Sequence, residues 1–88
     1  MSRIDDAISA HAQKRQQQRS IPSAVIDCLL NFGDVRPAGA GTERYYFTKR
    51  SWRKVSAYFG PSTKAFETYR NTYAIVSGGN VVTAAYRY

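Results

Sequence analysis

The sequence predicts a single α+β domain, in which two helices precede a small twisted antiparallel sheet of about four strands, with one or two further short helices. Three observations predict this class: apolar residues at helical spacing in the first third, two short aromatic or β-branched runs after it, and a hairpin pattern near the end. With 88 residues, of which 43% are hydrophobic, the chain can form one domain over residues 1–88 with a modest core.

The first helix is expected over residues 3–19. Ile4, Ala7 and Ile8 recur at the spacing of one helix face. Aspartates stand near the start of this segment and basic residues near its end, which suits the charges at the two ends of a helix. Pro22 ends the pattern, because the residue before a proline disfavours the helical conformation.

The second helix is expected from about Pro22 to Phe32, since proline is tolerated in a first turn and Gly33 can cap the last one. Its expected buried face consists of Val25, Ile26, Leu29 and Leu30. Short extended pieces follow around residues 34–36 and 44–47, and the intervening Pro-Ala-Gly-Ala-Gly segment predicts a turn or loop.

A third helix is expected from about Lys49 to Tyr58, and Gly60-Pro61 ends it. One side of this helix is expected to present Trp52, Val55, Ser56 and Phe59. Residues 62–70 fit another short helix, with Ala65, Phe66 and Tyr69 facing inward. Residues 72–76 and 81–86 then flank Gly-Gly-Asn, which predicts a β-hairpin with a glycine turn.

The net charge of +7 is large for 88 residues. Such an excess attracts polyanions through Coulomb forces and counterion release. We expect a nucleic acid, above all RNA, as the partner, and the charge leaves DNA, an anionic membrane surface and an acidic protein open.

The remaining composition narrows the class of protein. Cys28 is the single cysteine, so it has no intramolecular disulfide partner, and the opening residues lack the apolar core of a signal peptide. No apolar run approaches the length of a membrane span. We therefore expect a cytoplasmic protein with no membrane partner. One histidine and one cysteine do not make a zinc site, so we expect neither metal nor cofactor.

A helix over residues 3–19 would place His11, Arg15 and Arg19 on one face. A histidine can transfer protons near neutral pH, and arginines can bind a phosphate and stabilise charge that develops on it. The alternative is a histidine at the edge of the core beside two solvated arginines. On the last strand, Thr83, Ala85 and Arg87 alternate to one face, and Val82, Ala84, Tyr86 and Tyr88 are expected on the other. Arg87 could complete a phosphate site or lie solvated at a frayed end.

Aromatic and basic residues alternate closely over residues 44–54. Basic side chains attract a phosphate backbone, and exposed rings can stack on unpaired bases. Alternation places one of Tyr45 and Tyr46 inside and the other outside, and most rings of this run are expected in the core. The candidate RNA-binding residues are Arg44, Tyr46, Lys49, Arg50, Arg53 and Lys54.

The residues His11-Ala12, Arg15 and Arg19-Ser20-Ile21 resemble the opening signature of a family of small bacterial domains of unknown function, number forty-two fifty-eight. That signature has His-Ala, then Arg, then Arg-Gly-Ile, so Ser20 replaces its glycine. The last strand of the family carries a Thr and a terminal Arg, which residues 82–87 resemble. The resemblance covers about residues 9–87.

The family is similar to the RelE-like and barnase-like toxin ribonucleases, which have two helices followed by a small antiparallel sheet and cleave RNA without metal. The resemblance implies that His11 transfers protons, that Arg15, Arg19 and Arg87 bind the phosphate or the transition state, and that Thr83 assists. It also implies a cognate antitoxin as partner.

The sequence thus predicts a metal-independent endoribonuclease, the toxin of a toxin–antitoxin pair. Two other functions stay open. One is a non-catalytic module that binds RNA or DNA through the same cations and rings. The other is a small inhibitor or interaction protein that docks on an acidic partner.

Overall fold

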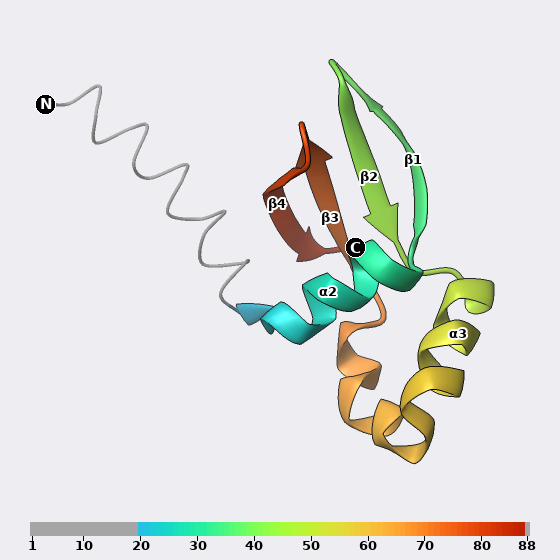
Figure 1. The fold of residues 1–88 in the computed structure, drawn as a ribbon. Helices are drawn as coiled ribbons and strands as arrows, with labels where there is room; N and C mark the ends of the chain where they lie inside the picture. The colour runs from blue at the N-terminus through green and yellow to red at the C-terminus, as the bar shows by residue number, and fades with distance from the viewer. Residues whose placement is uncertain (1–19, 88) are drawn as a thin grey trace, which may run out of the picture.

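A computed structural model describes residues 20–87, so the expected helix over residues 3–19 lies outside the described residues. Figure 1 shows helices and strands that alternate along the chain. Their order is α2 (Ser23–Phe32), β1 (Asp34–Gly39), β2 (Thr42–Tyr46), α3 (Lys49–Phe59), the 3-10 helix η1 (Gly60–Tyr69), β3 (Thr72–Ser77) and β4 (Asn80–Tyr86).

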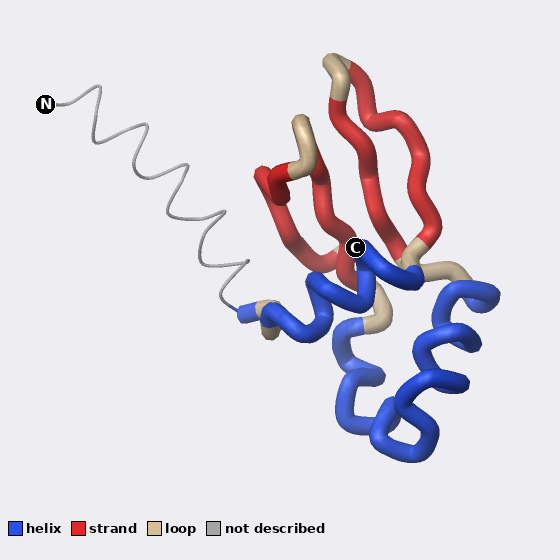
Figure 2. Tube along the Cα trace, in the orientation of Figure 1, coloured by secondary structure: helices blue, strands red, loops and turns tan. Residues whose placement is uncertain are grey.

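The four strands form one antiparallel sheet in the order β1-β2-β3-β4. Each outer strand forms a hairpin with the inner strand next to it in sequence, and α3 and η1 connect the two hairpins (Figure 2). The predicted α+β class, the four-stranded antiparallel sheet and the glycine-turn hairpin are therefore confirmed. Of the two helices expected before the sheet, α2 is described.

Helix α2 packs on one face of the sheet, and in Figure 1 it runs along the lower ends of the strands. Val25 and Leu29, one helical turn apart, are buried against the core, and Ile21 just before the helix is buried as well. Leu30 is 39% exposed, so the expectation that it shares this buried face is wrong. The reason is geometric, because Leu30 lies about 100° around the helix from Leu29.

Gly33 ends α2 for a different reason from the one the sequence suggests. Its φ of −64° is open to any residue, so no left-handed cap is involved. A Cβ at this position would instead lie 2.5 Å from the carbonyl oxygen of Leu29 and 3.1 Å from that of Tyr46. Glycine is therefore required because the helix end and strand β2 approach each other too closely for a side chain.

The core lies between α2, α3 and the covered face of the sheet. Ala74 and Ala84 oppose each other on β3 and β4 and are fully buried, and small side chains there let α2 approach the strands. Phe47 and Trp52 pack edge to face with their ring centroids 4.9 Å apart. Both rings are buried, as expected for most of the aromatic run.

Helix α3 begins at a capping box. Thr48 accepts a hydrogen bond from the Ser51 backbone N–H, and the Ser51 side chain accepts one from the Thr48 backbone N–H. Trp52 and Val55 form its buried side, as predicted. In η1 the expected inward position of Ala65 is wrong, since this residue is exposed and Thr63 is buried instead. The tighter 3-10 turn shifts the side chains relative to the α-helical spacing on which the expectation rested.

A β-bulge in β4 corrects one further expectation. Ile75 opposes Thr83 while Val76 opposes Val81, so Val82 is an extra residue with no opposite partner in β3. Val82 is 49% exposed and does not join Ala84 in the core. Thr83 and Ala85 keep the predicted alternation because the bulge precedes them.

The two leucines of α2 provide a test of this packing. We expect Leu29→Ala to lower the free energy of unfolding by about 2 to 5 kcal/mol, because it leaves a cavity in the core. The matched substitution Leu30→Ala, on an exposed side chain, should change it by about 0.5 kcal/mol or less. Urea unfolding followed by circular dichroism measures both values, and equal losses would contradict the described orientation of α2.

Candidate nucleic-acid interface

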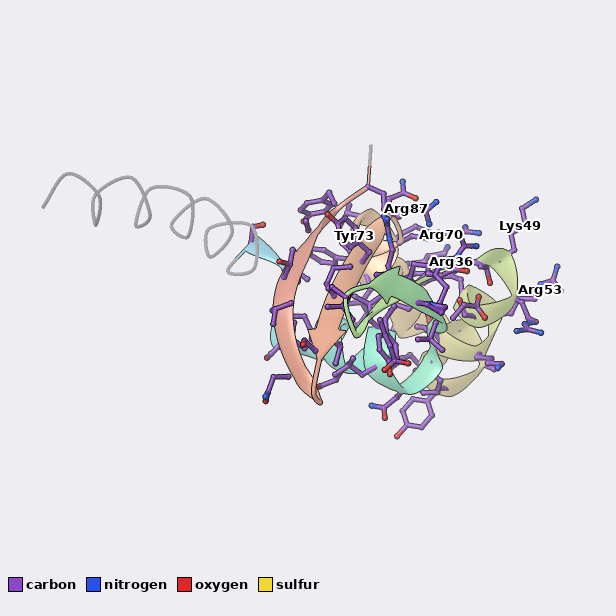
Figure 3. All side chains as sticks on the ribbon, turned by 90° about the horizontal axis from the view of Figure 1, so that it is seen from above. Arg36, Lys49, Arg53, Arg70, Tyr73 and Arg87 are labelled. Atoms are coloured by element: carbon purple, nitrogen blue, oxygen red, sulfur yellow. The ribbon has the colours of Figure 1, made fainter. Side chains whose placement is uncertain are left out.

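The face of the sheet opposite α2 is lined by basic and aromatic side chains. Directly opposed residues of antiparallel strands lie on the same face, so the pairing register identifies this open face. One row across the sheet consists of Arg36, Arg44, Ile75 and Thr83, and the next consists of Asp34, Tyr46, Tyr73 and Ala85. Figure 3 shows Arg36, Tyr73 and Arg87 on the side of the molecule away from α2.

Four of these side chains enclose a concavity of about 200 Å³. Its lining residues are Arg36, Arg44, Tyr46 and Arg87. They come from three strands or their ends: Arg36 from β1, Arg44 and Tyr46 from β2, and Arg87 from the residue that follows β4. The sheet therefore gathers three guanidinium groups that are far apart in the sequence.

Tyr46 lies at the centre of this concavity. The Nε of Arg36 donates a hydrogen bond to the Tyr46 hydroxyl at 3.2 Å, and the guanidinium carbon of Arg36 lies 5.1 Å from the ring centroid. The guanidinium carbon of Arg87 lies 5.8 Å from the same centroid. Both contacts are within the range of cation–π attraction, so one ring positions two arginines from opposite edges of the sheet.

Among residues 20–87, no acidic side chain lines the concavity. Glu43 is next to Arg44 on β2, and strand alternation turns it to the other face. Asp34 shares the open face but binds elsewhere: it accepts hydrogen bonds from the hydroxyl of Thr48 and, at 3.1 Å, from Nη2 of Arg50. The guanidinium groups thus present positive charge that no carboxylate of the described lining offsets.

The Thr48 hydroxyl holds the pKa of the Asp34 carboxyl below its usual range, and Arg50 contributes in the same direction against the opposing effect of burial. This carboxylate thereby connects β1 to the first turn of α3. Arg50 is paired with this carboxylate, so it is less available to bind an external anion.

The structure brings together only part of the predicted site. Arg44, Tyr46 and Arg87 meet in the concavity, and Thr83 lies on the same face outside its lining. On α3, Lys49 and Arg53 are exposed, and Figure 3 shows them on the far side of Arg36 from Tyr73. Lys54 is also exposed and lies outside the lining of the concavity. The predicted catalytic residues His11, Arg15 and Arg19 lie outside the described residues.

Sequence reasoning missed Arg36 and Tyr73 as site residues. Arg36 reaches the concavity because the turn after β1 places it directly opposite Arg44. Tyr73 reaches the open face because it opposes Tyr46. The alternation within each strand, combined with the pairing register, would have identified both residues. The register between β1 and β2 depends on the length of the turn in the Gly-rich segment, which the sequence does not fix.

Other chemistries find little support in the part of the chain that the structure describes. Residues 20–87 contain no group of three His, Cys, Asp or Glu side chains gathered as metal ligands. Burial and the neighbouring Asp27 raise the pKa of the half-buried Cys28 thiol, which disfavours a reactive thiolate. No helix within the same residues is both long enough and apolar enough to cross a membrane.

Comparison of the chain with protein-family models, with curated proteins and with solved structures yields no match.

The Asp34 network provides a test that depends on pH. Because its pKa is lower in the folded than in the unfolded state, ionised Asp34 stabilises the fold above the unfolded value of about 3.9, and this contribution is lost as the pH falls through the folded value. We expect Asp34→Asn to lower the free energy of unfolding by about 1 kcal/mol at pH 7. The difference from wild type should shrink below about pH 4 in urea titrations. A difference independent of pH would contradict the described network.

Proposed function

We propose that this protein is a metal-independent endoribonuclease that binds RNA across the open face of its sheet. One observation carries the proposal: Arg36, Arg44 and Arg87 converge with Tyr46 on a single concavity, and none of the acidic side chains that the structure describes lines it. Guanidinium groups bind phosphate oxygens in a bidentate manner, which makes a phosphodiester the natural ligand of such a site.

The same groups support catalysis as well as binding. When the 2′-oxygen of a ribose attacks the adjacent phosphorus, negative charge accumulates on the non-bridging oxygens. Positioned guanidinium groups stabilise that charge, so the proposed reaction needs no metal ion. The bond from phosphorus to the 5′-oxygen then breaks, and the products are a 2′,3′-cyclic phosphate and a 5′-hydroxyl.

One proton is transferred twice in this reaction. A base removes the proton of the 2′-hydroxyl, and its conjugate acid then donates that proton to the departing 5′-oxygen. We assign this acid–base role to His11 on the strength of its sequence context and the family resemblance. Arg15 and Arg19 would bind the phosphate beside Arg87, and Thr83 would assist from the open face. A cognate antitoxin would then be an acidic protein that covers this cationic face.

A second candidate is a non-catalytic module that binds RNA or DNA. It is favoured by the absence of histidine from residues 20–87, which leaves the described concavity with arginines and one tyrosine and without a side chain that titrates near neutral pH. The two candidates share the ligand and differ in whether the RNA is cut.

Cleavage of a labelled RNA in the presence of EDTA tests the proposal. We expect wild type to cut it and to leave cyclic phosphate ends. Arg36→Gln and Arg87→Gln should each slow cleavage by about 100-fold, because each removes one stabilising donor. His11→Ala should abolish cleavage while leaving RNA binding largely intact.

Lys64→Gln is the matched control, since it removes one positive charge from an exposed residue of η1 outside the concavity. Its rate should stay within about twofold of wild type if contacts and not net charge determine cleavage. Intact RNA with wild type, together with binding that the arginine variants weaken, would replace the ribonuclease by the binding module. Rates that fall equally in all charge variants would remove the concavity from the mechanism.

A further inference from the structure

The closest cation–π contact among the described residues joins Arg44 and Tyr73 on neighbouring strands. The guanidinium carbon of Arg44 lies 4.2 Å from the centroid of the Tyr73 ring, against 5.1 to 5.9 Å for the others. Both side chains are half-buried on the open face. A guanidinium over an aromatic face loses little further freedom when it binds a ligand, so the pair forms a pre-oriented surface.

Arg44 also lines the concavity, so its guanidinium contacts Tyr73 on one side and borders open space on another. A planar cation in this position can stack on a second planar group as well as bind a phosphate. Nucleobases provide such planes, and stacking on arginine or aromatic side chains is a common way to bind them.

The pair lies beside the phosphate-binding groups. Arg44 is two residues from Tyr46 on β2, a separation of about 7 Å along a strand, and it directly opposes Arg36 on β1. A phosphate held by Arg36, Tyr46 and Arg87 would therefore have the base of its own or of the adjacent nucleotide within reach of Arg44. The phosphate-binding groups and Arg44 together would therefore bind the phosphate and the base of one nucleotide.

We propose that Arg44, held by Tyr73, is a stacking platform for an unpaired nucleobase, so that the site takes single-stranded RNA in preference to a duplex. This inference rests on the proposed function for the identity of the ligand. A base inside a duplex has both faces covered by its neighbours and cannot stack on a side chain unless it leaves the helix.

Binding of 2′-O-methyl RNA, which the proposed reaction cannot cleave, tests the inference without catalysis. Three labelled probes of one length would be compared by fluorescence anisotropy: a single strand of mixed sequence, the same backbone without bases, and a blunt duplex. The first two carry the same number of phosphates. We expect wild type to bind the single strand about 5- to 150-fold more tightly than the baseless chain, the range that stacking of one base provides.

Two variants locate the platform. Arg44→Lys keeps the positive charge and removes the planar group, and Tyr73→Leu removes the ring that holds it. Each should bring the affinity for the single strand down toward that for the baseless chain, which itself should change by less than about twofold in Arg44→Lys. Arg36→Gln is the control, because it should weaken binding of both probes by the same factor. Thermal unfolding shows whether each variant is folded.

The outcomes separate the two proposals. Equal affinities of wild type for the single strand and the baseless chain would overturn the platform and leave phosphate binding intact. Tighter binding of the duplex would overturn it as well. Failure of wild type to bind any of the three probes would overturn both the platform and the proposed function.

Discussion

The pairing register of β2 determines which chemical groups this protein presents. Arg44 and Tyr46 reach the open face because β2 pairs in register with β1 on one side and with β3 on the other. A slip by one residue would turn both side chains toward the covered face and bring Tyr45 and Glu43 to the open face in their place. The buried contacts of Tyr45 with the core therefore maintain the register, and the register maintains the arginine cluster.

The covered face of the sheet contributes to the core, and the open face carries the candidate site. On the covered face, small alanines and the glycine at the end of α2 allow the helix to approach the strands closely. The core packs between the helices and this covered face, so the other face can carry charge at little cost to the core. Rigid strands also hold side chains more firmly than loops do, which suits a site that must position a phosphate.

Local patterns predicted the elements well because each depends on neighbours in the sequence. The apolar spacing of Val25 and Leu29 and the Gly-Gly-Asn turn locate a helix and a hairpin without knowledge of the rest. The misjudged positions depend on distant contacts. The exposure of Leu30 depends on which side of α2 faces the sheet, and the exposure of Val82 depends on the bulge in β4. Likewise, Arg36 joins the candidate site only through pairing across a turn, and no local pattern fixes that pairing.

The bulge in β4 has a consequence for how the molecule behaves in a crowded solution. β1 and β4 are the outer strands, and an outer strand offers unpaired backbone groups to which the strand of another molecule could add. Val82 interrupts the regular spacing of those groups on β4, and Pro37 removes one donor from β1. Each edge thus resists edge-to-edge aggregation, which a sheet rich in tyrosine and valine would otherwise favour.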